Sequence, residues 1–460
     1  MPALTLLLDV AANPLDQIRQ GGLQTSLADR AMGLVGLAVL LGLAVLLSYD
    51  RRRIPWRLVA AGLALQATFG VLVLKTTPGR WFFDAVGGVV SGLLGFTAEG
   101  ARFVFGNLIQ PTVPVGTPGP GGGLDTTLGL VGSTGALFAF GVLPTIIFFS
   151  SLMSVLYHLG IMQLVVKGLA WVMQRTLRTS GAETLSASGN IFLGQTEAPL
   201  LIKPFVNTLT SSELFTVMVG GFATVAGGVL AAYTLMLQGV FPNIAGHLLA
   251  ASVMNAPAGL LLSKIIRPET GVPLSRDSLH VAVEKPDANV IEAAASGAAV
   301  GVQLALNVGA MLMAFIGLIA MFNFGIGWLG GLAGLQGLTL QTILGTVLRP
   351  LAWVMGVPWQ DTAYVGGLVG VKVVLNEFVS YAQFAGDLQS GALAISPRSA
   401  VISAYALLGF ANFSSIGIQI GGIGGLAPGR RSDIARLGLR AMLAGNLAAF
   451  MSATLAGMLM

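Results

Sequence analysis

Long apolar segments separated by short polar ones dominate the hydropathy pattern of this chain. A transmembrane helix needs about 20 consecutive, mostly apolar residues. Eight segments reach or approach that length, and we expect each to form a spanning helix: 31–48, 57–74, 134–156, 214–238, 246–266, 299–322, 399–424 and 437–459. The pattern therefore predicts an all-α polytopic membrane protein with eight transmembrane helices.

Three further segments do not have the pattern of a span. Residues 1–30 predict a short exposed or interfacial lead-in, because they lack the positively charged start of a signal peptide. Residues 80–106 carry charges at intervals and predict an amphipathic helix on the membrane surface. Residues 107–128 are rich in proline and glycine and predict a loose connecting loop.

Composition supports a membrane protein and argues against an enzyme. The chain is 54% hydrophobic and only 9% charged, whereas soluble domains carry about 25% charged residues. Cysteine is absent, which excludes a thiol nucleophile and a cysteine metal site. The three histidines lack metal-binding spacing, and the glycine run at 421–425 lacks the context of a phosphate loop. An intramembrane enzyme would need a metal cluster or a nucleophile–base pair, and neither is visible.

Clusters of lysine and arginine predict how the chain is oriented. The net charge of +5 does not indicate a nucleic-acid partner, because the basic residues are grouped in loops between spans: 51–57, 167–178, 264–285 and 430–440. These clusters share one side of the membrane only if residues 181–200 and 340–378 each enter and leave by the same face. The positive-inside rule then predicts two re-entrant hairpins, cytoplasmic clusters and both termini outside.

The order of these segments repeats once along the chain. A hairpin, an interrupted span at 222–229 and a plain span are followed by a second hairpin, an interrupted span at 409–417 and a plain span. Paired interrupted segments of this kind indicate a transporter binding site. The alternative is that glycines 220, 221, 227 and 228 only permit tight helix packing. We divide the chain into a lead-in (1–30), scaffold helices with the surface helix and loop (31–180), a first transport repeat (181–266), an interfacial segment and scaffold helix (267–325), and a second transport repeat (326–460).

Each predicted hairpin contains one glutamate, Glu197 or Glu377. A charge at bilayer depth costs at least ~2.5–3.5 kcal/mol on insertion scales, so such residues usually face a cavity or a partner. Gln195 and Thr196 place an amide and a hydroxyl beside Glu197, and at a hairpin tip the three groups could converge on a polar heterocycle. The alternatives are a cytoplasmic loop for the first hairpin and an ion pair with Lys372 for Glu377.

Two weaker patterns lie in the interrupted spans. Asn412 and Ser415 are three residues apart and share a helix face, with Phe410 close enough to pack on a flat ring. The alternative is ordinary hydrogen bonding between membrane helices, worth only ~0.6 kcal/mol on average. Asn190 and Thr224 could contribute to a cation site, because side-chain oxygens and unwound backbone carbonyls coordinate sodium in such folds.

Several motifs resemble the concentrative nucleoside transporter family. The similar stretches are SASGNIFLGQTEAPLLIKP (186–204), VLNEFVSYAQF (374–384), GFANFSSIGI (409–418), and the segments 138–163, 252–265 and 307–315. The resemblance runs from about residue 30 to the end. It implies an inverted-repeat transport domain, a homotrimer embedded in membrane lipid, and an elevator mechanism in which a transport part carrying the hairpins moves across a scaffold.

The resemblance also implies a role for individual residues. Gln195, Thr196 and Glu197 would face the nucleobase, Val229 and Phe410 would pack on it, and Glu377, Asn412 and Ser415 would bind ribose hydroxyls. Sodium would be held by the Asn190 side chain, the Leu193 and Val225 carbonyls and the Thr224 hydroxyl.

The resemblance finally implies a function, which is import of nucleosides across an inner membrane coupled to a sodium gradient. Some bacterial members use protons and differ around the first hairpin tip, so the retained Asn190 favours sodium. In the family, the residue before the glutamine and the pair in the helix break influence the choice of base, and here they are Gly194 and Thr224–Val225. Glycine leaves room where a serine would favour pyrimidines, so we expect purine nucleosides to be accepted. The alternatives are a proton-coupled symporter and an uncoupled permease or channel.

Overall fold

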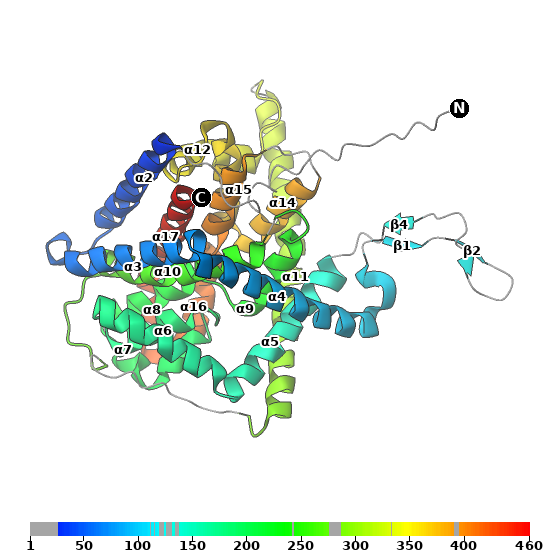
Figure 1. The fold of residues 1–460 in the computed structure, drawn as a ribbon. Helices are drawn as coiled ribbons and strands as arrows, with labels where there is room; N and C mark the ends of the chain where they lie inside the picture. Colours follow the sequence, from blue (N-terminus) through cyan, green and yellow to red (C-terminus); the bar gives the residue numbers. More distant parts are fainter. Residues whose placement is uncertain are drawn as a thin grey trace.

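A computed structural model describes residues 26–460, except 111, 115, 119–123, 126–130, 134–137, 242, 276–286, 333 and 391–394. Most of the predicted lead-in and parts of the 107–128 segment therefore lie outside the described residues. The described part is built almost entirely of helices, as Figure 1 shows.

Two units of the chain have the same order of elements: a pair of short helices, a broken helix and an unbroken helix. The first unit comprises α7 (Gly181–Gly189), η4 (Ala198–Thr208), α8 (Ser211–Ala223), α9 (Gly227–Leu237) and α10 (Ile244–Ile266). The second comprises α13 (Thr362–Val374), α14 (Glu377–Gln389), α15 (Pro397–Leu407), α16 (Phe413–Leu426) and α17 (Arg431–Leu459). The breaks after α8 and α15 coincide with the interruptions that the sequence predicts, and the short helices of each pair pack against each other.

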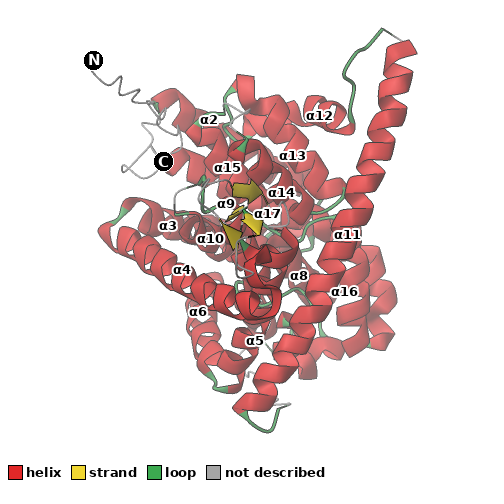
Figure 2. Cartoon of the chain, turned by 90° about the vertical axis from the view of Figure 1, so that its right-hand side faces the viewer, coloured by secondary structure: helices red, strands yellow, loops and turns green. Residues whose placement is uncertain are grey.

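The remaining helices flank these two units. They are α2 (Leu27–Leu46), η1 (Arg51–Arg53), α3 (Trp56–Lys75), α4 (Thr77–Phe105), η2 (Gly106–Ile109), the π-helical η3 (Phe138–Val142), α5 (Leu143–His158), α6 (Ile161–Leu177), α11 (Val290–Leu332), α12 (Leu340–Val354), η5 (Trp359–Asp361) and η6 (Pro428–Arg430). The long helix α11 runs along one side of the molecule (Figure 2).

The second helix pair begins and ends later than the sequence predicts. Residues 340–354 form the separate helix α12, and the pair that contains Glu377 is α13 with α14, so the predicted boundary 340–378 is wrong. Gly356 ends the preceding turn with φ +92°, a conformation that favours glycine. Asn376 caps α14 by accepting a hydrogen bond from the Val379 N–H at 2.8 Å. Glu377 therefore begins the returning helix instead of ending the hairpin.

The segment predicted as a loose loop contains short strands, so the description of the fold as all-α needs a small correction. Strand β1 (Thr112–Pro114) pairs antiparallel with β4 (Val131–Ser133), and β2 (Thr117–Pro118) pairs with β3 (Leu124–Asp125). β-Branched threonine and valine favour extended backbone at these positions. The strands lie apart from the helical body (Figure 1).

Seven helical segments among the described residues are long and apolar enough to cross a membrane: 56–75, 77–109, 138–158, 211–237, 244–266, 290–332 and 428–459. The segment 30–46 is shorter, and the predicted span 399–424 is divided by its break. The segment 77–109 qualifies by length, although its charge pattern predicts a surface helix. A helical membrane protein is thus supported, while the count of eight spans stays a prediction.

The helices of the two units form the interior. In the most apolar part of α8–α9 and of α10, 89% of the residues are buried, compared with 22% for α11. A helix that is apolar all round belongs inside a protein or a bilayer. The two repeated units therefore form the core of this chain, and α11 covers one side of it.

Candidate functional site

The two helix breaks lie against each other at the centre of the repeated units. The Phe410 N–H in the second break donates a hydrogen bond to the Thr224 carbonyl in the first, at 3.2 Å. Gly409 has φ +121°, and a Cβ added to it would lie 2.7 Å from the Phe222 carbonyl oxygen. Only glycine fits this turn, because both the backbone conformation and the close approach exclude a side chain.

An asparagine from each unbroken helix supports one break. Asn255 of α10 donates to the Ala223 carbonyl at 2.7 Å, and Asn446 of α17 donates to the Ala411 carbonyl at 2.8 Å. Carbonyls at a helix end have no partner within the helix and are costly to bury alone. These two side chains therefore allow non-helical backbone to exist deep inside the protein.

The tip between α7 and η4 packs closely on α8 and α16 through glycines. A Cβ added at Gly221 would lie 2.8 Å from the Gln195 Cβ, and one added at Gly422 would lie 2.5 Å from the Thr196 Cγ2. The glycines of α8 do permit tight packing, as the alternative interpretation held. The space left by these glycines is filled by the polar residues of the tip. Close packing and formation of the site therefore occur together.

A pocket lies where this tip, the start of α14 and the two breaks meet. Its cavity measures about 150 Å³ and is partly open to solvent. All the residues predicted to contact the substrate line it: Gln195, Thr196, Glu197, Val229, Glu377, Phe410, Asn412 and Ser415. The structure therefore brings together side chains that lie more than 200 positions apart in the sequence.

Glu377 is held by two neutral donors. Its side chain is 4% exposed, and its carboxylate accepts hydrogen bonds from the Asn412 amide at 2.8 Å and the Tyr233 hydroxyl at 3.0 Å. Within the described part of the chain, Lys372 forms no ion pair with Glu377. Its ammonium donates instead to the Ala406 carbonyl at 2.9 Å, so the predicted alternative of an ion pair is wrong.

The other end of the pocket carries an amide network beside a carboxylate. Gln195 donates to the Ser415 hydroxyl at 3.2 Å and accepts from the Gln419 amide at 3.2 Å. Glu197 is exposed, lines the pocket and accepts from the Gly194 N–H at 3.1 Å. This end can therefore both donate and accept hydrogen bonds toward a ligand.

Several site residues are missing from the predicted set. Tyr233 and Gln419 each follow a predicted residue by four positions, Val229 and Ser415, and so share its helix face. This spacing of four residues was a signal in the sequence that could have identified Tyr233 and Gln419. The pocket is also closed by an apolar stripe of α11 with spacings of four and three, which looks like any lipid-facing stripe in the sequence: Leu304, Val308 and Met311.

The residues predicted to hold sodium belong to the first tip and to the first break, which are joined where the Gly227 N–H donates to the Phe192 carbonyl at 2.9 Å. Asn190 is fully buried; its amide nitrogen donates to the Ser186 carbonyl at 3.0 Å, and its side-chain oxygen has no hydrogen-bond partner. The nearby carbonyls of Leu193 and Val225 accept no hydrogen bond from any described residue. Other buried side-chain oxygens also lack a hydrogen-bond partner among the described residues, as at Asn255 and Asn446, but at Asn190 two unpaired carbonyls belong to the same tip and break. This set of oxygens therefore fits a small hard cation.

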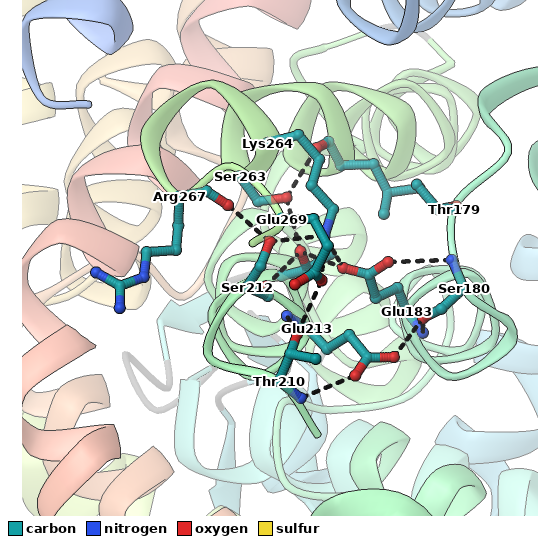
Figure 3. A network of polar contacts seen from close by, with 12 residues as sticks. Thr179, Ser180, Glu183, Thr210, Ser212, Glu213, Ser263, Lys264, Arg267 and Glu269 are labelled. Carbon is teal, nitrogen blue, oxygen red and sulfur yellow. Dashed lines mark hydrogen bonds and ion pairs between the residues drawn. The ribbon is translucent and has the colours of Figure 1, made fainter. Parts of the chain in front are cut away.

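A second polar network, shown in Figure 3, lies at the end of α7 opposite the tip. Lys264 forms ion pairs with Glu183 and, at 3.7 Å, with Glu269. The Ser180 hydroxyl donates to Glu213 at 2.7 Å. Ser180 and Glu183 form a capping box, as do Thr210 and Glu213, a pattern that the sequence could have revealed. The network joins the starts of α7 and α8 to the end of α10 and so fixes the base of the tip.

Two repeated units, each with a broken helix, enclose a largely apolar pocket into which several polar side chains converge. This is the architecture of a secondary transporter. Family models match most of the chain: Na+ dependent nucleoside transporter N-terminus at 35–108, nucleoside recognition at 139–239, and Na+ dependent nucleoside transporter C-terminus at 247–457. The chain belongs to this family of concentrative, Na+-dependent nucleoside transporters.

Similar proteins agree with this assignment. The chain is 46% identical to an uncharacterised transporter of Haemophilus influenzae over 92% of this chain and 96% of that protein. It is 42% identical to sodium/nucleoside cotransporter 1 of Rattus norvegicus over 94% of this chain and 64% of that protein. Among solved structures, CNTnw in an inward-facing substrate-bound state is 44% identical, with a TM-score of 0.83 and coverage of 93% and 97%.

Proposed function

We propose that this protein is a secondary active transporter that imports nucleosides together with sodium ions. The observation that carries the proposal is a single pocket that joins the two predicted acidic tips, with an unpaired buried oxygen of Asn190 next to it. A polar, partly aromatic ligand suits this pocket better than an ion alone, because amides, hydroxyls and apolar side chains alternate around it.

The substrate assignment follows the chemistry at each end of the pocket. Gln195, Thr196 and Glu197 supply the mixed donors and acceptors that a nucleobase edge requires, and Val229 and Phe410 supply apolar faces for its ring. At the other end, the Glu377 carboxylate uses two of its roughly four acceptor sites on Asn412 and Tyr233. We assign the remaining two to ribose hydroxyls, with Asn412 and Ser415 beside them.

The sodium assignment explains how ion and nucleoside would be coupled. The proposed ligands are the side chains of Asn190 and Thr224 and the carbonyls of Leu193 and Val225. They belong to the tip and to the first break, which the Gly227 N–H already joins by donating to the Phe192 carbonyl at 2.9 Å. A cation here would fix the tip in the position that presents Gln195 to the pocket. Ion binding would then strengthen nucleoside binding, and by linkage the reverse.

The membrane arrangement is proposed on the same basis. We assign the pairs α7–η4 and α13–α14 as re-entrant hairpins of a transport part spanning 181–266 and 326–460, within an eight-span homotrimer of the inner membrane with both termini outside. Support comes from the exposed apolar surface of α11, which has Met313 at 77% and Phe324 at 80% exposure. Such a surface requires lipid or neighbouring subunits around it.

The experiment is uptake of labelled uridine and adenosine into proteoliposomes under an inward sodium gradient, with a proton gradient in parallel. Concentrative uptake that requires sodium supports the proposal. Uptake driven only by protons would favour the proton symporter, and uptake that equilibrates without concentrating would favour the permease. Absence of uptake of either nucleoside under both gradients would refute nucleoside transport.

A further inference from the structure

The second helix break differs from the first in how its backbone carbonyls are satisfied. Each break exposes carbonyl groups at the end of a half-helix, where the helix dipole adds a partial negative charge. In the first break the Val225 carbonyl accepts no hydrogen bond from a described residue, and neither does the Leu193 carbonyl at the tip beside it. These groups are free to receive a mobile cation.

In the second break the carbonyls at the end of α15 bind a cation that belongs to the chain. Lys372 of α13 is fully buried, and its ammonium donates to the Ala406 carbonyl at 2.9 Å and to the Leu408 carbonyl at 3.5 Å. Both acceptors lie at the C-terminal end of α15. The ammonium also lies 5.6 Å above the centre of the Phe450 ring. No carboxylate among the described residues lies within ion-pair distance of it, so its charge is balanced by the helix end and by the more distant Glu377 carboxylate.

Counting from the helix ends places the contacts of Lys372 beside the positions equivalent to the predicted sodium ligands. Helix α8 ends at Ala223 and α15 ends at Leu407, so Ala406 corresponds to Phe222 and Leu408 to Thr224. The Thr224 hydroxyl is a predicted sodium ligand, and its carbonyl accepts from the Phe410 N–H. Helix α7 ends at Gly189 and α13 at Val374, so position 372 corresponds to position 187, one helical turn before Asn190. The flexible four-carbon stem of a lysine can cover that turn and bring the ammonium to the level of the tip.

We propose that Lys372 is a tethered cation, whose ammonium takes in the second repeat the position that the exchangeable sodium ion takes in the first. The second break is then stabilised at all times, and only the first depends on an ion from solution. The comparison with sodium rests on the proposed function, but the role of the Lys372 charge does not. It follows that this pair of related sites exchanges one cation, not two, in a transport cycle.

The test is chemical rescue of Lys372→Ala in purified protein, followed by thermal unfolding. Removing the side chain leaves a cavity and two buried carbonyls without a donor. We expect a lower unfolding temperature than in the wild type, a substantial part of which returns on addition of n-propylammonium. The neutral 1-propanol, which is similar in size, should not restore it. Val371→Ala is the matched control, because Val371 is fully buried in the same helix and removing its methyl groups leaves an apolar cavity.

Rescue of Lys372→Ala by the ammonium ion alone, with no such response in Val371→Ala, supports the proposal. Equal rescue by the alcohol, or no rescue by either, overturns it in favour of simple packing. If Lys372→Ala does not fold, the unfolding temperature of Lys372→Met provides the test instead. This variant keeps the aliphatic part of the side chain and removes only the charge and its hydrogen-bond donors. A Lys372→Met protein as stable as the wild type overturns the proposal, and one less stable than Val371→Ala supports it.

Nucleoside binding separates this proposal from the proposed function. In Lys372→Met we expect uridine affinity, measured by titration calorimetry in sodium buffer, to fall by about tenfold or more, the equivalent of 1.4 kcal/mol. A wild-type protein that binds no nucleoside would refute the proposed function and leave the unfolding result to decide the role of Lys372. A wild-type protein that binds uridine no better than Lys372→Met would refute the coupling of this charge to the site.

Discussion

Replacing Glu377 by glutamine is the most direct test of how the pocket binds a ribose. The change keeps the size and planarity of the side chain and removes its negative charge. The Asn412 amide, now 2.8 Å from one carboxylate oxygen, and the Tyr233 hydroxyl, 3.0 Å from the other, both donate to this group. The glutamine side chain keeps one acceptor oxygen and gains an NH2 group, so the side chain can no longer accept at both positions.

The magnitude follows from the acceptor sites left free for the substrate. Two of roughly four are used within the protein, which leaves two for ribose hydroxyls. A hydrogen bond to a charged group contributes about 1.5–3 kcal/mol and a neutral one about 0.5–1.5 kcal/mol. The loss of charge over two bonds is therefore about 2–3 kcal/mol. At 1.4 kcal/mol for each factor of ten, uridine affinity should fall about 30- to 150-fold.

The assay compares uridine with its 2′- and 3′-deoxy analogues by titration calorimetry, in wild type and in Glu377→Gln. In the wild type the analogues should bind more weakly, and in the variant much of that difference should disappear. Glu197→Gln is the matched control: it removes the same charge from the base-facing end and should leave the ratio of uridine to deoxyuridine affinity unchanged. If the deoxy analogues lose affinity equally in Glu377→Gln and wild type, Glu377 does not bind the ribose.

Three further changes test other parts of the site. Asn190→Ala removes the unpaired buried oxygen, so the sodium concentration needed for half-maximal uridine binding should rise about tenfold or more; an unchanged sodium dependence would exclude Asn190 as a ligand. Gly194→Ser should fold normally, because the nearest atom to an added Cβ is 3.5 Å away, and should lower the ratio of adenosine to uridine uptake. Gly409→Ala should lower the free energy of unfolding by about 1–3 kcal/mol, because alanine is strained at φ +121° and meets a carbonyl at 2.7 Å. Gly425→Ala, with open space around its Cβ, is the control for the last and should leave the unfolding temperature nearly unchanged.

Local sequence patterns predict the elements that form this site, because each element has a recognisable signal within a few residues. Carboxylates inside apolar segments, glycine and asparagine within spans, and proline or glycine at turns all reflect the cost of burying charge or free backbone in lipid. The sequence therefore identifies both breaks and the residues of both tips. In the structure, the carboxylate, amide and hydroxyl side chains predicted for these tips and breaks line one pocket.

Contacts between distant elements are what the sequence could not predict. Tyr233 and Glu377 are 144 residues apart, and Gln195 and Gln419 are 224 apart, so no local period relates them. The predicted pairing of Lys372 with Glu377 fails for the same reason. It was drawn from their short separation, whereas the helix end that binds the ammonium lies in another element, more than 30 residues further along the chain.

The boundary of the second helix pair illustrates a different limit. The sequence-based prediction takes 340–378 as one segment, although the residues PWQDT (358–362) interrupt its hydropathy where the structure has two helices. The turn between them depends on the left-handed conformation of Gly356 and on Pro358, which precedes the single turn of η5. Many glycines in this chain sit inside helices, so a glycine alone does not mark a helix end. Here the proline and the polar residues that follow Gly356 mark the boundary together with the conformation of the turn.

The difference between the two breaks suggests why a repeated structure should contain one mobile and one fixed cation. If both half-helix ends needed an ion from solution, each empty site would leave buried carbonyls unpaired, at about 1–3 kcal/mol for each group. With Lys372 bound to Ala406 and Leu408, the second tip keeps its structure in every state, and Glu377 stays in place for the ribose. If sodium binds as proposed, the first tip alone changes with it, and a single binding event would control access of the base to Gln195. In this arrangement, ion binding and nucleoside binding are coupled because the two units have the same order of elements but differ in the cation that each break binds.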